Sequence, residues 1–361
     1  MSVDSRCDGM VALVTGSSRG LGKAIAARLA AHGATVALTA RTMDPDPKYQ
    51  GSLSQTRDEI VAGGGRAVAV QADLSQSEDR ARLFDEVVSA VGAPDILVNN
   101  AAVTFLRPLD AFPERRVRLM MEMHVLGPLQ LSQLAIPAMR DRGRGWILNL
   151  TSVGGDLPPG PPFSEFDRTA GFGVYGTVKA ALNRLTKSLA AELYDDGIAV
   201  NAAAPSNPVA TPGAGTLDLA KTDTEDIELI TETAFRLCTG DPKTMTGRIA
   251  HTQSFLAEVG WFQPAGGWSR STSRSCDGDS RLPASRTSRR WPVVRPASPF
   301  EACDPAGQWW SRSPRRVLSR SRTGMCCGRP ASSKRLRGRG FRFPRCCGRS
   351  RVIHPSRLRC S

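Results

Sequence analysis

Short, wholly apolar segments alternate with longer amphipathic segments between residues 10 and 250. The predicted strands are residues 10–14, 35–38, 67–71, 96–98, 146–150, 198–201 and 248–250. The predicted helices are residues 21–32, 78–91, 114–140, 174–194 and 225–237. Strands that are apolar on both faces and joined by helices are typical of a parallel sheet with helices on both sides. The sequence therefore predicts an α/β fold: a doubly wound (Rossmann) parallel sheet of about seven strands in a single domain. Such a sheet binds its ligand at the carboxyl ends of its strands.

Two polar stretches interrupt this alternation. Residues 42–53 (TMDPDPKYQGSL) form a predicted loop after the second strand, and residues 154–173 contain four prolines close together. Proline lacks a backbone N–H and opposes both helix and sheet, so we expect irregular backbone in the second stretch. It directly follows the strand at 146–150, and we therefore expect it to form a wall or lid of the site.

The composition of the chain changes near residue 260. After that residue there are 23 Lys and Arg against 4 Asp and Glu, a net charge of +19, whereas residues 1–260 carry a net charge of −5. Seven of the nine cysteines also lie after residue 260. The sequence thus predicts a domain over 1–260 and a basic tail over 261–361. The overall charge of +14 is no nucleic-acid signal for the whole protein, because it comes from the tail.

The tail has no helical or strand periodicity, and we expect it to be disordered or irregular. It contains 22 Arg but one Lys and one Ile, and neither Asn nor Tyr. This bias is typical of GC-rich DNA translated in a wrong frame, so we hypothesise a frameshift near residue 260. The alternative is RNA binding, since SRSPRRVLSRSR (residues 311–322) resembles arginine/serine-rich RNA-binding segments. We favour the frameshift because Trp and Cys are unusual in such segments, and we expect no nucleic-acid partner.

A glycine-rich turn, TGSSRGLG at residues 15–22, follows the first predicted strand and opens a helix. Glycines let the backbone approach a pyrophosphate closely, and the amides and dipole of the following helix attract that anion. The spacing T-G-x3-G-x-G resembles that of the short-chain dehydrogenase/reductase family. The pattern therefore predicts a dinucleotide site.

The rest of that family's pattern appears in order from about residue 10 to residue 260. Asp73 follows the third strand, Asn99–Ala102 (NNAA) the fourth and Ser152 the fifth, and Tyr175 and Lys179 supply Y-x3-K. Residues 205–211 resemble the loop that holds the nicotinamide carboxamide. The last Ala of NNAA and the Ser at 206 stand where the family usually has Gly. The loop at residues 42–53 resembles the corresponding loop of the family's hydroxysteroid-dehydrogenase-like subgroup. The resemblance implies an NAD(P)-dependent oxidoreductase that acts on CH–OH groups and assembles as a homodimer or homotetramer.

The expected cofactor is NADP, with NAD possible. The second strand ends in Thr39-Ala40-Arg41, with no carboxylate to bind a ribose 2′-hydroxyl, whereas Arg41 and Arg19 can pair with a 2′-phosphate. The alternative is that Arg41 is a solvated surface charge. The expected cofactor-binding residues are Gly16, Ser18, Arg19, Gly20, Leu21, Gly22, Arg41, Asp73, Leu74, Asn100, Ala101, Tyr175, Lys179, Val209 and Thr211.

Tyr175 and Lys179 lie four residues apart, so on a helix they share a face. A neighbouring ammonium should lower the pKa of the phenol, which could then exchange a proton with an alcohol or ketone oxygen while hydride moves. The resemblance implies that Lys179 also binds the nicotinamide ribose. Ser152 is expected to donate a hydrogen bond to the reacting oxygen. The interval from Ser152 to Tyr175 is longer than is common in the family, and the loop at 154–173 accounts for the excess.

His124 is the main departure from the family pattern. The family has a catalytic Asn in an N-x-x-G pattern on the long helix, where this chain has His124-Val125-Leu126-Gly127. An imidazole can donate and accept hydrogen bonds and so support a proton relay, although a protonated ring would oppose Lys179. The alternative is a packed histidine with no role. A dinucleotide-binding protein that has lost turnover is therefore the second candidate function.

The remaining expectations concern substrate and setting. The apolar PPF and FGV segments favour a lipophilic alcohol or carbonyl substrate. We expect no membrane span, since no run approaches the ~18 apolar residues that a span needs. The start MSVDSRCDG has no apolar signal core, so we expect a cytoplasmic protein. The four histidines are scattered, and before the tail no Cys and His have zinc-ligand spacing, so we expect no metal site.

Overall fold

The computed structural model describes residues 6–47, 50–211 and 224–261. All the residues proposed above for catalysis and cofactor binding lie within these ranges. The predicted tail, apart from Trp261, lies outside the described residues. Trp261 itself packs against the apolar core beside the last helix.

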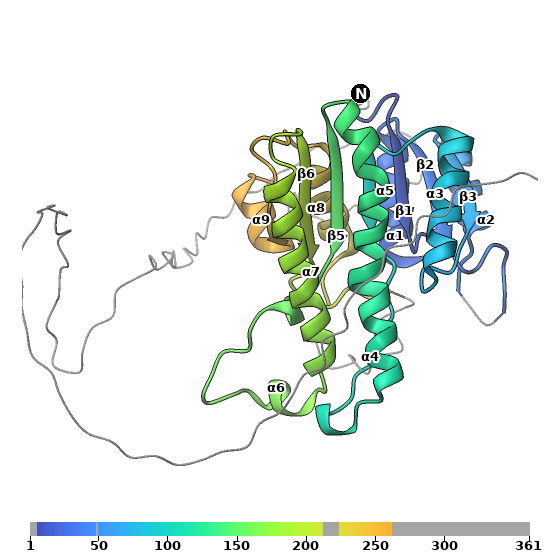
Figure 1. The fold of residues 1–361 in the computed structure, drawn as a ribbon. Coiled ribbons are helices and arrows are strands. Elements are labelled where there is room, and N and C mark those ends of the chain that lie inside the picture. Colours follow the sequence, from blue (N-terminus) through green and yellow to red (C-terminus); the bar gives the residue numbers. More distant parts are fainter. Residues whose placement is uncertain (1–5, 48–49, 212–223, 262–361) are drawn as a thin grey trace, which may run out of the picture. The chain divides into compact units, whose positions relative to one another are not determined.

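Seven parallel strands form one sheet, in the order β3-β2-β1-β4-β5-β6-β7 (Figure 1). The strands are β1 (Val11–Thr15), β2 (Thr35–Ala40), β3 (Arg66–Gln71), β4 (Ile96–Asn99), β5 (Gly145–Leu150), β6 (Ile198–Ala204) and β7 (Ile249–His251). This confirms the predicted doubly wound sheet. The chain runs outward from β1 to β3 and then crosses over to β4, so the order reverses between β1 and β4. A ligand crevice is expected at the carboxyl ends of the strands on either side of such a reversal.

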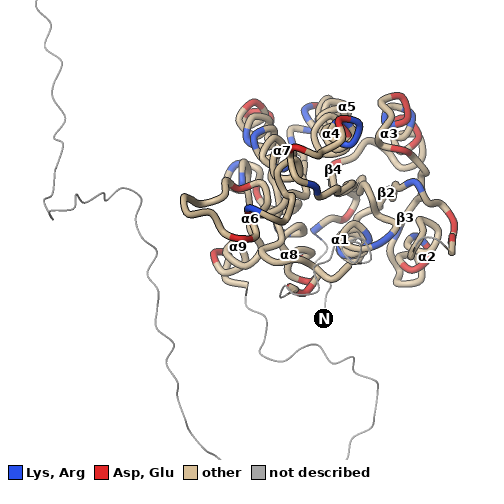
Figure 2. Tube along the Cα trace, turned by 90° about the horizontal axis from the view of Figure 1, so that it is seen from below, with Lys and Arg blue, Asp and Glu red and all other residues tan. Residues whose placement is uncertain are grey.

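Helices cover both faces of the sheet, as Figure 2 shows from the carboxyl ends of the strands. On one face lie α1 (Gly20–Ala31), α2 (Leu53–Ala62), α8 (Ile227–Thr239) and α9 (Thr252–Glu258). On the other lie α3 (Ser77–Val91), α4 (Glu114–Met121), α5 (Gly127–Asp141) and α7 (Gly173–Glu192). Each layer buries its own apolar cluster against the sheet, which is why the strands are apolar on both faces.

The helices depart from the sequence prediction in four places. Neither α2 nor α9 was predicted; α2 begins after Ser52, whose hydroxyl accepts a hydrogen bond from the Gln55 amide. A short helix, α6 (Glu165–Thr169), lies in the stretch predicted to be irregular, after its prolines and behind a Ser164 cap. The helix predicted at 114–140 is interrupted by a π-helical segment, Glu122–Leu126, which separates α4 from α5.

Two 3₁₀ segments, Leu109–Ala111 and Val153–Gly155, complete the described elements. Within the described ranges, no helix is both long enough and apolar enough to cross a membrane.

Candidate active site

The glycine loop is packed tightly between β1 and the end of β4. A Cβ on Gly22 would lie 2.4 Å from the Gly16 carbonyl oxygen and 2.5 Å from the Asn100 amide nitrogen Nδ2, so only glycine fits. The Thr15 hydroxyl accepts hydrogen bonds from the backbone amides of Asn100 (2.9 Å) and Ala101 (3.0 Å). The structure therefore brings the predicted residues from two separate strands together at the carboxyl edge of the sheet. Thr15, which joins them, was not among the predicted site residues.

The N-terminus of α1 is suited to an anion. Its first turn holds no acidic residue, and no side chain caps it at Arg19. The leading amides of a helix lack intrahelical acceptors, and the helix dipole favours negative charge there. Thr211, in the loop after β6, has its Cβ 3.5 Å from where a Cβ on Gly20 would be. The loop after β6 thus reaches the glycine loop, and these groups fit a dinucleotide pyrophosphate between them.

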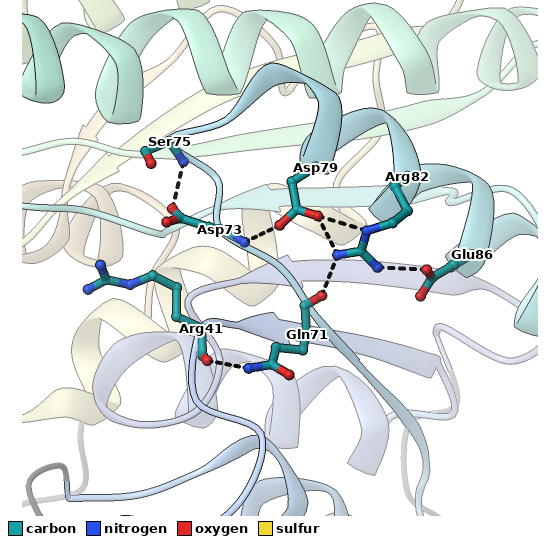
Figure 3. Close-up of polar contacts among 7 residues, drawn as sticks. All are labelled: Arg41, Gln71, Asp73, Ser75, Asp79, Arg82 and Glu86. Atoms are coloured by element: carbon teal, nitrogen blue, oxygen red, sulfur yellow. Dashed lines mark hydrogen bonds and ion pairs between the residues drawn. The ribbon is translucent and has the colours of Figure 1, made fainter.

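A cavity of about 520 Å³ lies beside the carboxyl ends of β2 and β3. Its lining residues are Arg41, Met43, Ala69, Val70, Gln71, Ala72, Asp73, Asp79, Arg82 and Glu86. Asp73 is held in place from both sides: its carboxylate accepts the Ser75 amide (3.0 Å), and its own amide donates to Asp79 (2.5 Å). Arg82 in turn binds Asp79 and Glu86 (Figure 3).

Arg41 enters this cavity directly after β2. Its carbonyl oxygen accepts a hydrogen bond from Gln71 Nε2 (2.8 Å), which fixes the backbone there. Figure 3 shows its guanidinium extending on the side of Asp73, away from Arg82 and Glu86. Within the described residues this guanidinium has no hydrogen bond or ion pair, so it remains able to bind an anion.

Ser152 and Tyr175 come together although 23 positions separate them. Ser152 lies two residues beyond β5 and accepts the Gly154 amide (3.1 Å), while Tyr175 lies in the first turn of α7. The helix passes so close that a Cβ on Gly176 would lie 2.6 Å from the Gly154 carbonyl oxygen. The Ser152 and Tyr175 hydroxyls are hydrogen-bonded. The extra residues of the long loop therefore bulge outward and leave this pair intact.

Lys179 is buried one turn along the same helix. Its ammonium donates to the Leu150 carbonyl oxygen (2.7 Å) and lies 5.9 Å from the centre of the Tyr175 ring. Burial lowers the pKa of Lys179 to about 7. Burial also raises the pKa of the Tyr175 phenol, and the hydrogen bond with Ser152 only partly opposes this. Burial therefore opposes the predicted acidification of Tyr175, and the contact that lowers the pKa of the phenol is the hydrogen bond with Ser152.

His124 lies in the π-helical segment and is 1% exposed. Its Nε2 donates to the Val103 carbonyl oxygen (2.7 Å), and its ring meets the Tyr175 ring edge-on at 6.2 Å. Burial, and then the charge of Lys179, lower the pKa of His124 to about 3, although the bond to Val103 raises it. The imidazole is therefore neutral at pH 7 and adds no positive charge beside Lys179.

Arg80 joins several segments around the site and was not predicted from the sequence to do so. It is almost fully buried on α3 and bonds Glu122, Gln130 and the Leu74 carbonyl oxygen, each at 2.6 Å. These bonds tie the turn after β3 to the junction of α4 and α5 that contains His124. In the sequence Arg80 stands in a charged stretch (SEDRAR) and cannot be told from a solvated arginine.

No group of three or more His, Cys, Asp and Glu within the described ranges is arranged to hold a metal ion.

Comparison with known proteins points to the same family as the sequence motifs. A family model described as short chain dehydrogenase matches residues 10–221. An uncharacterized oxidoreductase of Methylorubrum extorquens is 33% identical over 250 residues, which covers 69% of this chain and 92% of that protein. The human hydroxysteroid dehydrogenase-like protein 2 is 29% identical over 258 residues, 71% of this chain but only 59% of the human protein.

A crystal structure of a metagenomic short-chain oxidoreductase in complex with NADP is also similar. It aligns with a TM-score of 0.56 at 30% identity and covers 68% of this chain and 97% of that chain. The glycine loop, Ser152, Tyr175 and Lys179 all lie within residues 10–221, which the family model matches. The chain belongs to the short-chain dehydrogenase family of NAD(P)-dependent oxidoreductases.

Proposed function

We propose that this protein is an NADP-dependent oxidoreductase that transfers hydride between the nicotinamide and a secondary alcohol or ketone. The observation that carries the proposal is the convergence of Ser152, Tyr175 and Lys179 just beyond the carboxyl end of β5. These groups come from β5 and α7, and they meet where a doubly wound sheet binds its ligand.

The protein groups have distinct tasks in this reaction. The bound nucleotide supplies or accepts the hydride. Tyr175 donates its hydroxyl proton to the carbonyl oxygen, and Ser152 donates a second hydrogen bond to that oxygen. The raised pKa of Tyr175 keeps the phenol protonated at neutral pH, which suits the reduction of a ketone. Lys179, whose ammonium donates to the Leu150 carbonyl oxygen, would bind the nicotinamide ribose, as the family resemblance implies.

The preference for NADP rests on the end of β2. The end of that strand, Thr39-Ala40-Arg41, contains no carboxylate. The guanidinium of Arg41 enters the cavity beside Asp73 (Figure 3). An arginine can form paired, charge-assisted hydrogen bonds with a 2′-phosphate. The NADP complex of the metagenomic relative supports the same choice.

A lipophilic substrate is supported by the aromatic residues around Tyr175. The Phe172 ring meets the Tyr175 ring edge-on at 5.5 Å, and Phe166 lies 4.9 Å from Phe172. Leu157 and Phe163 of the same loop are exposed. The Phe172 and Phe166 rings, which continue from the Tyr175 ring, suit a large apolar carbonyl compound. We also propose a homo-oligomer, as the family resemblance implies.

Tyr175→Phe tests the proposal. Wild-type protein should consume NADPH with a member of a carbonyl panel that includes steroid ketones, and more slowly with NADH. The variant should lose about 10²- to 10⁴-fold in turnover, the range of a positioned acid/base, and keep its NADPH affinity. Undiminished turnover in the variant would exclude the assigned role of Tyr175. NADPH binding with no oxidation by any carbonyl would instead favour a binding protein that has lost turnover.

A further inference from the structure

Glu225 is a buried carboxylate at the base of the loop that follows β6. The sequence predicts a helix that begins at Glu225, but α8 begins at Ile227 with Asp226 as its cap. Glu225 is 7% exposed. Its backbone amide donates to the Pro208 carbonyl oxygen (2.9 Å), and it forms a β-bridge with Val209. It is therefore joined by its backbone to the loop predicted to hold the nicotinamide.

The Glu225 carboxylate holds the same loop through its side chain. One oxygen accepts the backbone amides of Ser206 (3.1 Å) and Asn207 (3.2 Å), and both oxygens lie 3.0 Å from the Thr252 hydroxyl. In the described part of the chain, no Lys or Arg forms an ion pair with it. A buried, unpaired carboxylate is costly unless it is well hydrogen-bonded. Burial accordingly raises the pKa of Glu225, while its bonds to Thr252, Asn207 and Ser206 lower it.

Ser206, which stands where the family usually has glycine, extends this network to α9. Its hydroxyl lies 3.0 Å from the Thr252 hydroxyl and accepts the Gln253 amide (3.2 Å). Its own amide also donates to Thr252 (3.0 Å). Two segments distant in sequence, at Glu225 and at the start of α9, thus fix the same few backbone atoms of one loop.

The loop at residues 205–211 crosses the carboxyl edge of the sheet between the glycine loop and the Ser152–Tyr175 pair. It leaves β6, which pairs with β5, and Thr211 in this loop lies against Gly20 of the glycine loop. A dinucleotide that reaches from α1 to Tyr175 has to pass along it. The position of the Ser206 and Asn207 backbone therefore bears directly on how the nicotinamide end is held.

We propose that Glu225 is a positioning residue: with Thr252, its carboxylate fixes residues 205–209 in the conformation that binds the nicotinamide end of the dinucleotide. This rests on the proposed function. Glu225 itself is assigned no contact with substrate or cofactor. Its effect passes through the two backbone amides that it orders.

Glu225→Gln removes the charge and one acceptor while keeping the size of the side chain. We expect NADPH to bind about tenfold more weakly, in the range for loss of a hydrogen bond to a charged group. The amides of residues 206 and 207 should exchange hydrogen faster in the nucleotide-free protein. The urea midpoint should not fall, because the variant no longer buries a charge, and this separates positioning from general destabilisation.

Three further variants sharpen the test. Thr252→Val should reproduce the loss of affinity, whereas Thr252→Ser, which keeps the hydroxyl, should restore it. Glu258→Gln removes an exposed carboxylate that pairs with Arg248, and it should change neither NADPH affinity nor exchange at 206 and 207.

The outcomes distinguish the two proposals. An affinity within twofold of wild type in Glu225→Gln, or unchanged exchange at 206 and 207, would overturn the role of Glu225 while leaving the oxidoreductase proposal intact. An equal affinity loss in Thr252→Ser and Thr252→Val would also overturn it. If wild-type protein bound neither NADPH nor NADH, the proposed function would fail and the positioning role with it.

Discussion

His124 should make the fold sensitive to acid. Its pKa is about 3 in the folded protein, against 6.5 for an ordinary histidine. As the pH falls from 6.5 towards 3, the unfolded chain therefore takes up a proton that the folded protein cannot, and the free energy of unfolding falls. Each pKa unit corresponds to about 1.4 kcal/mol, so the 1.5 units between 6.5 and pH 5 give about 2 kcal/mol. Because the ring is 1% exposed, solvent screening takes little from this value.

Urea unfolding of wild type and His124→Asn at pH 7.5 and pH 5.0 measures this effect. Between these two pH values, wild type should lose about 2 kcal/mol more stability than the variant, because asparagine has no proton to gain. His251→Asn, at the end of β7, is the matched control and should keep the acid-dependent loss, since His124 is still present. If His124→Asn lost as much stability as wild type, the assignment of a buried neutral imidazole would be wrong.

Three other predictions concern activity. His124→Asn should keep or raise turnover in steady-state assays, and a tenfold loss would show that this chain needs the imidazole. Arg41→Ala should cut the preference for NADPH over NADH by about 10- to 100-fold, from the loss of charge-assisted hydrogen bonds; equal losses with both nucleotides would contradict a 2′-phosphate contact. Phe172→Ala should raise KM for a large apolar ketone by about tenfold, from lost apolar contact, and leave KM for a small ketone unchanged. Equal KM changes for both ketones would contradict a role for Phe172 in binding the apolar part of the substrate.

The sheet and the order of the site motifs could be predicted because their signals are local. Strands buried on both faces must be apolar throughout, and the long helices carry apolar residues at helical spacing. The glycine loop could also be predicted from the sequence, because its backbone requires glycine: a Cβ on Gly22 would collide with the Gly16 carbonyl oxygen. The helix α2 was missed because it buries only Leu53, Thr56 and Ile60. Neither α6 nor α9 is long enough to show a helical period.

The chemical state of the site depends on packing between segments far apart in the chain. From spacing alone, Tyr175 and Lys179 predict an acidic phenol, yet burial raises the pKa of one and lowers that of the other. The same holds for Glu225, which the sequence predicts to be an ordinary charged residue at the start of a helix. Whether a charged side chain is solvated or buried depends on neighbours supplied by other elements, and the free energy of desolvation then determines its charge. Residue order therefore specifies which groups meet at the carboxyl edge, and the assembled fold decides which of them are charged.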